Sequence, residues 1–161
     1  MVILGIDPGT NRIGYGLLEN KGRDLALLKY GCIELKSSGS AKDFAGLYDA
    51  IEKLIKEWKP GVLAIEKLFF FKNNKTVMQV SEARGVIMLA GTKNGIPIKE
   101  FTPLQVKQAV SSYGRAQKRE VQKMVRLILN LKEDPKPDDA ADALAIAICC
   151  ANSNVFQQFS S

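Results

Sequence analysis

Short apolar runs and turn signals dominate the first third of the chain. Residues 2–7 (VILGID) are almost entirely apolar and predict a short buried strand. The DPGTN turn follows, and RIGYGLLE then predicts the hairpin partner of that strand. Residues 25–35 predict a third strand. Three successive strands with short connections indicate the start of an antiparallel sheet.

Helical and extended patterns alternate along the rest of the chain. The SSGSAKD segment predicts a loop ending in a helix N-cap, and FAGLYDAIEKLIKEW then carries apolar residues at helical spacing. Further strands are predicted at 61–66 and at IPIKEF. The remaining helical patterns cover 74–93, 103–112, 117–131 and 138–151. This order predicts an α/β fold with a mixed five-stranded sheet flanked by helices.

Two of the predicted strands end in an acid, Asp7 and Glu66. A crossover through a helix makes two strands of one sheet parallel, and neighbouring strands lie about 4.8 Å apart. If the two strands are neighbours, both carboxylates lie at the carboxyl edge of the sheet. Open α/β sheets usually bind their ligands at that edge.

A third acidic cluster begins the last predicted helix, in PKPDDAADALAIAICCA. Capping and the helix dipole explain Asp138 adequately. Asp139 and Asp142 are three residues apart and share a helix face, and Asp138 with Asp142 is an alternative pair. Taken singly, each acid is most simply a surface or capping residue. Four carboxylates on strand ends and one helix face together favour a site for hard divalent cations.

Composition narrows the possible chemistry. The 161 residues fit a single domain, expected over 1–152, with a flexible tail over 153–161. The chain has no histidine and three cysteines without C-x-x-C spacing, which argues against zinc sites and Ser-His or Cys-His triads. No apolar run approaches the roughly 20 residues of a membrane span, and no signal peptide is evident, so a cytoplasmic protein is expected.

Positive charge is concentrated in one window. The formal net charge is +6, and residues 103–136 hold eight basic residues against three acidic ones. Such a patch indicates a polyanionic partner, although each lysine taken alone is better explained as part of a solvated helix face. A run of three phenylalanines follows shortly after Glu66: the LFFFK segment contains Phe69, Phe70 and Phe71. They cannot all point inward from an extended segment, and an exposed phenylalanine suits stacking on an unpaired base.

Five segments, in order, resemble the RuvC-type Holliday junction resolvases over about residues 2–152. They are GIDPGTNRIGYG (5–16), AIEKLFFFKNN (64–74), QVKQAV (105–110), AQKREVQKMV (116–125) and DDAADALAIAI (138–148). The resemblance implies a ribonuclease-H-like fold and a homodimer that cuts four-way DNA junctions symmetrically in recombination and repair. It also implies hydrolysis to 5′-phosphate and 3′-hydroxyl ends with Mg²⁺, or Mn²⁺ in its place, two ions per site, and a branch-migration motor as a possible partner.

The resemblance assigns roles to individual positions. It makes Asp7, Glu66, Asp139 and Asp142 the metal ligands and catalytic residues, with Asp139 preferred to Asp138 because the family spacing is Asp-Ala-Ala-Asp. Phe69 matches an aromatic residue that meets a base at the opened junction, although Phe70 or Phe71 could take its place. The DNA-binding basic residues are expected to be Lys107, Lys118 and Arg119.

Three other protein classes share parts of this pattern. An actin-like or sugar-kinase ATPase shares the Asp-x-Gly-Thr turn but needs a second domain, for which 161 residues leave no room. A YqgF-type nuclease acting on RNA shares the opening motif, and a non-catalytic junction-binding protein would explain the basic window. For the dimer interface we expect the 74–93 helix, through Val77, Val80, Ile87 and Leu89, unless that helix simply faces the core.

Overall fold

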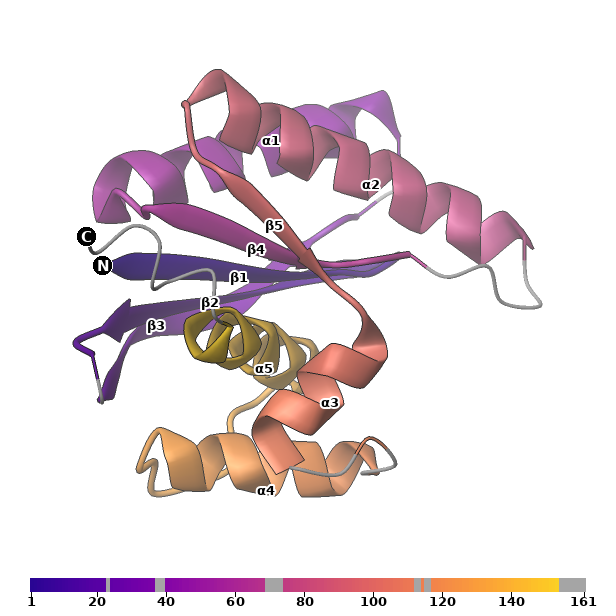
Figure 1. The fold of residues 1–161 in the computed structure, drawn as a ribbon. Helices are drawn as coiled ribbons and strands as arrows, with labels where there is room; N and C mark the ends of the chain where they lie inside the picture. Colours follow the sequence, from indigo (N-terminus) through magenta and orange to yellow (C-terminus); the bar gives the residue numbers. More distant parts are fainter. Residues whose placement is uncertain (23, 37–39, 69–73, 112–113, 115–116, 154–161) are drawn as a thin grey trace.

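The computed structural model describes all residues except 23, 37–39, 69–73, 112–113, 115–116 and 154–161. A five-stranded mixed sheet with the strand order β3-β2-β1-β4-β5 forms its centre (Figure 1). The strands are β1 (Val2–Pro8), β2 (Arg12–Asn20), β3 (Leu25–Glu34), β4 (Val62–Glu66) and β5 (Ile98–Phe101). The helices are α1 (Ala41–Trp58), α2 (Asn74–Lys93), α3 (Pro103–Ser111), α4 (Lys118–Ile128) and α5 (Asp138–Asn152). The predicted mixed sheet flanked by helices is confirmed.

The strand pairing follows from the connections. β1, β2 and β3 are joined by short turns and pair antiparallel. The crossover through α1 makes β4 parallel to β1, with Ile6 opposite Ile65, and the crossover through α2 makes β5 parallel to β4. The two strands that end in acids are therefore neighbours, which is the condition on which Asp7 and Glu66 were expected to meet.

Helices cover both faces of the sheet. α1 and α2 lie on one face, whereas α5 lies on the other and separates the sheet from α4 (Figure 1). Because side chains alternate along a strand, Leu4 and Ile6 pack with α1 and α2, while Ile3 packs with α5. The same alternation directs Asp7 of β1 and Glu66 of β4 to the α5 face.

Glycines in β1 and β2 let α5 approach the sheet very closely. A Cβ on Gly5 would lie 2.3 Å from the carbonyl oxygen of Ala143, and one on Gly14 would lie 1.9 Å from that of Asp139. A Cβ on Gly16 would lie 2.6 Å from Cδ2 of the Leu144 side chain and 3.1 Å from the Leu144 backbone nitrogen. Backbone thus packs against backbone, and the first turn of α5 is set against the carboxyl end of β1.

Local features refine the sequence-based expectations. The N-cap of α1 is Ser40, whose Oγ accepts a hydrogen bond from the Asp43 N–H at 3.2 Å. α4 ends at Ile128, earlier than the predicted 131, because Asn130 adopts a left-handed φ of 53° that a helix cannot continue. Within the described residues, no helix is long and apolar enough to cross a membrane.

The predicted dimer surface on α2 needs one correction. Ile87 is fully buried against the sheet together with Ala83 and Ala90, so its assignment to an interface was wrong. Met78 and Leu89 lie on the other side of the helix and are 66% and 54% exposed. The alternative expectation of a core-facing helix is thus correct for one face of α2.

Candidate active site at the carboxyl edge of the sheet

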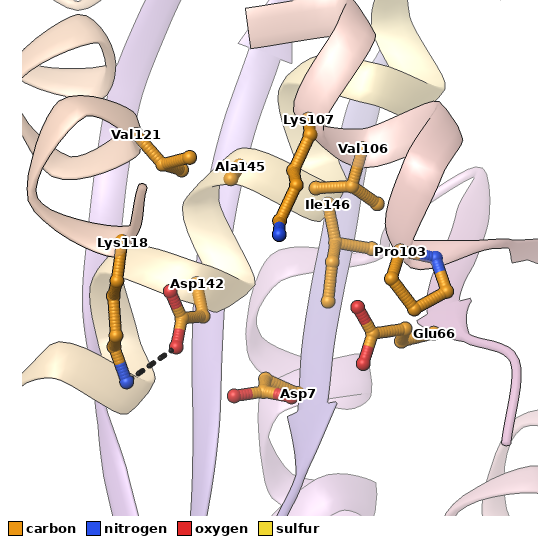
Figure 2. A pocket seen from close by; sticks show the side chains of 10 residues that line it. All are labelled: Asp7, Glu66, Pro103, Val106, Lys107, Lys118, Val121, Asp142, Ala145 and Ile146. Atoms are coloured by element: carbon orange, nitrogen blue, oxygen red, sulfur yellow. Dashed lines mark ion pairs between the residues drawn. The ribbon is translucent and has the colours of Figure 1, made fainter. Parts of the chain in front are cut away.

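Asp7 and Glu66 lie side by side at the ends of β1 and β4. The β1–β4 pairing runs from Ile3 to Ile6 in β1, and each acid follows the last paired residue of its strand. Both side chains line a cavity of about 260 Å³, and Figure 2 shows their carboxylates facing the same opening. The sheet therefore brings together the two acids that end these strands.

Asp142 completes the acidic wall from α5. Its neighbours Ala141, Ala143 and Ala145 are buried, yet the Asp142 side chain keeps 29% of its surface exposed and lines the same cavity. Asp139, one turn earlier, is half-buried and does not line the cavity, although its charge acts on Asp7 and Asp142. Of this pair, Asp142 thus faces the cavity at the strand ends, whereas Asp139 acts on the cluster through its charge.

Two more helices, α3 and α4, close the cavity. The residues that line it come from both strand ends and from α3, α4 and α5: Asp7, Glu66, Pro103, Val106, Lys107, Lys118, Val121, Asp142, Ala145 and Ile146. Its inner wall is apolar, whereas the carboxylates and the two lysines gather on one side (Figure 2). An apolar wall keeps water away and strengthens the electrostatic interactions beside it.

The carboxylates oppose one another's ionisation. Burial raises the pKa of Asp7 well above its usual value, and the charges of Asp142, Glu66 and Asp139 raise it further, against an opposing effect of Lys118. Burial also raises the pKa of Glu66, as does the charge of Asp142. Burial likewise raises the pKa of Asp142 despite its hydrogen bond with Lys118. The acids form one electrostatically coupled group that a cation would relieve.

The lysines counter this negative charge from α3 and α4. Lys118 Nζ lies 3.1 Å from Asp142 Oδ2 and 3.8 Å from Asp138 Oδ2. Burial tends to lower the pKa of Lys118, but these carboxylates outweigh that effect and raise it. Lys107 points toward the space between Asp142 and Glu66 (Figure 2), and its charge partly offsets the raised pKa of Glu66. Arg119 is exposed on α4 and does not line the cavity.

The donor set suits a hard divalent cation, since it consists of carboxylate oxygens without nitrogen or sulfur. Within the described part of the chain, no three such side chains are arranged so that they could hold an ion as they stand. Mutual repulsion and the Lys118–Asp142 ion pair both favour this open arrangement. The residues present fit a divalent cation because their donor atoms are carboxylate oxygens and because their negative charges converge on one cavity.

Some contributions to the site were not predicted from the sequence. The glycines that seat α5 were overlooked, although Gly14 and Gly16 alternate within a strand pattern, which is a recognised signal of close backbone approach. The apolar wall that Val106 and Val121 contribute was not predicted either. Phe69, Phe70 and Phe71, like the tail beyond Ser153, lie outside the described residues.

Comparisons with known proteins agree with this arrangement. Residues 3–150 match the family model described as crossover junction endodeoxyribonuclease RuvC. RuvC of Desulfitobacterium hafniense is 53% identical over 154 residues, covering 95% of this chain and 93% of the relative. RuvC of Petrotoga mobilis is 52% identical over 153 residues, covering 94% of each chain.

Solved structures agree in fold. The Thermus thermophilus RuvC structure has a TM-score of 0.86 at 34% identity and covers 99% of this chain and 97% of its own. The same protein in complex with Holliday junction substrate has a TM-score of 0.87 at 36% identity, with 92% of each chain covered. The expected ribonuclease-H-like fold is confirmed. This chain belongs to the RuvC family of crossover junction endodeoxyribonucleases.

Proposed function

We propose that this chain resolves four-way DNA junctions in recombination and repair by divalent-metal-dependent hydrolysis, leaving 5′-phosphate and 3′-hydroxyl ends. The observation that carries the proposal is the convergence of Asp7, Glu66 and Asp142 on one cavity edged by Lys107 and Lys118. Support comes from the Thermus thermophilus RuvC complex, which contains Holliday junction substrate.

Asp7, Glu66, Asp142 and Asp139 are the residues that would hold Mg²⁺ or Mn²⁺, with two ions per site. When bound there, the cations supply a water of lowered pKa and stabilise the charge that develops on the leaving 3′ oxygen. Asp7 is the central ligand in this proposal, because it is the acid on which the charges of the other three act. Asp139, which does not line the cavity, is the ligand with the weakest geometric support.

The lysines act on the DNA rather than on the cations. Lys118 neutralises Asp142 while no cation is present, and its exposed ammonium is available to a backbone phosphate. Lys107 adds positive charge between Asp142 and Glu66. Arg119 and Lys123, both exposed on α4, continue the same charge away from the acids and bind phosphates outside the cavity. Phe69 remains the proposed residue for stacking on a base.

A homodimer is the proposed working unit, because symmetric cutting needs two sites related by a two-fold axis. The side of α2 that exposes Met78 and Leu89 is the proposed interface. A branch-migration motor is the proposed partner of that dimer. Size-exclusion chromatography with light scattering tests the first point, since a chain that stays monomeric at micromolar concentration contradicts it.

Two competing functions make different predictions. A YqgF-type nuclease would prefer RNA, but the family match over residues 3–150 favours the RuvC function. A non-catalytic junction-binding protein would bind a four-way junction without cutting it. That function leaves the cluster of half-buried, mutually repelling acids unexplained.

The decisive experiment compares an end-labelled four-way junction with linear duplex and with RNA of the same sequence, each with Mg²⁺ and with EDTA. We expect paired, symmetric nicks in the junction alone and with Mg²⁺ alone. Asp7→Asn should abolish cutting and retain junction binding, whereas Asp49→Asn, which changes an exposed acid of α1, should cut normally. Binding without cutting under every divalent metal would refute the proposal.

A further inference from the structure

Arg84 of α2 touches the strand end that carries Glu66 from the face of the sheet opposite the cavity. Its Nε donates a hydrogen bond of 3.4 Å to the backbone carbonyl oxygen of Glu66. The Arg84 side chain is only 17% exposed, and it does not line the cavity. It therefore reaches the main chain of an active-site residue without being able to contact DNA there.

Glu100 of β5 fixes the other side of the guanidinium. Arg84 Nη2 forms an ion pair with Glu100 Oε2, and Glu100 lies opposite Ile65 in the β4–β5 pairing. Arg84 thus contacts two adjacent strands with two nitrogens of one planar group, and only arginine offers such a fork. Since Glu100 neutralises its charge, Arg84 acts on geometry rather than as a counter-charge to the carboxylates.

Glu66 needs such support because it lies where the sheet pairing ends. The β1–β4 ladder stops at Ile65, whereas on the β5 side Glu66 is still paired with Phe101, and the Lys67 N–H donates a hydrogen bond to the Phe101 carbonyl oxygen. Repulsion from Asp142 acts on the Glu66 side chain at the same point. With ladder bonds on the β5 side alone, this strand end is less able to resist that repulsion.

We propose that Arg84, held by Glu100, is a positioning residue that fixes the backbone of Glu66 so that its carboxylate stays directed into the cavity. The inference rests on the proposed function for its catalytic consequence. The effect of Arg84 on cation binding by the carboxylates does not depend on that function. Groups that orient metal ligands typically contribute about 10–100-fold in metal affinity or activity.

The test compares Arg84→Lys and Glu100→Gln with Glu52→Gln, which removes the carboxylate of an exposed ion pair with Lys56 on α1. Lysine keeps the charge but cannot make both contacts, and glutamine keeps the shape of Glu100 without its charge. Four quantities are measured: Mn²⁺ affinity of the protein alone by electron paramagnetic resonance, junction affinity in EDTA, the cutting rate at saturating enzyme, and the melting temperature.

We expect Arg84→Lys and Glu100→Gln to weaken Mn²⁺ binding and slow cutting about 10–100-fold, with junction affinity in EDTA unchanged. Glu52→Gln should match the wild type in all four. Wild-type Mn²⁺ affinity in both site variants overturns the inference, as does a parallel loss of folding and junction affinity in both, which would make Arg84 a purely structural residue. A wild type that binds Mn²⁺ but never cuts junctions refutes the proposed function alone, because the Mn²⁺ arm still decides the role of Arg84.

Discussion

Replacing Gly14 by alanine tests whether the close packing of α5 on the sheet builds the site. The new Cβ would lie 1.9 Å from the Asp139 carbonyl oxygen, and real Cβ atoms essentially never approach closer than 3.0 Å. The two backbones must therefore separate by at least 1.1 Å, the difference between those distances. No flexible side chain can absorb this shift, because the obstructing atoms belong to the main chain.

The magnitude follows from that displacement. Overpacking of this kind costs about 1–3 kcal/mol of the free energy of unfolding. At roughly 2–4 °C per kcal/mol for a domain of this size, the melting temperature should fall by about 2–12 °C. A 1 Å misplacement of catalytic groups can slow a reaction about 100-fold, and Asp139 and Asp142 both move with the first turn of α5.

Gly46→Ala is the matched control. Gly46 lies in α1, and a Cβ there meets nothing within 4 Å. Alanine in a helix should therefore stabilise the protein by about 0.4–1 kcal/mol without affecting cutting. The assays are differential scanning calorimetry and junction cutting at saturating enzyme with Mg²⁺. Wild-type melting temperature and cutting rate in Gly14→Ala would refute the packing argument.

Further predictions concern charge, metal and thiols. Asp7→Asn should raise the free energy of unfolding without metal at pH 8 by about 0.5–2 kcal/mol. The folded-state pKa of Asp7 is raised, so its ionisation destabilises the fold above the unfolded-state pKa of about 3.9. The gain should therefore vanish as the pH falls to that value in calorimetric scans, and a constant gain contradicts the cause. Mg²⁺ at 100 times its Kd should stabilise the wild type by about 2.7 kcal/mol, reversibly with EDTA, and an unchanged melting temperature would argue against a cation site. Lys118→Ala should slow cutting without weakening Mn²⁺ binding. A wild-type cutting rate in this variant would mean that Lys118 is only part of a solvated helix face. Burial raises the pKa of Cys149 to about 11 and that of Cys150 to about 12, so a thiol reagent at pH 8 should modify the half-buried Cys32 first; earlier labelling of the buried pair contradicts this.

The sequence was sufficient to predict what depends on periodicity and connection rules. Parallel pairing after a crossover brings Asp7 and Glu66 together, and three-residue spacing gives Asp139 and Asp142 one helix face. Contacts between distant segments were beyond such rules. Nothing in the sequence around Arg84 indicates a contact with the Glu66 carbonyl eighteen residues earlier. An apolar residue such as Ile87 has the same sequence pattern whether it packs in the core or against a partner chain.

The acidic cluster draws its members from β1, β4 and α5, and α5 is the last described element of the chain. A nascent chain still on the ribosome without residues 138–152 has Asp7 and Glu66 but neither Asp139 nor Asp142, and its sheet lacks the helix that covers these acids. Incomplete translation products should therefore lack nuclease activity. The order of elements along the chain therefore delays the ability to break DNA until α5 has been synthesised.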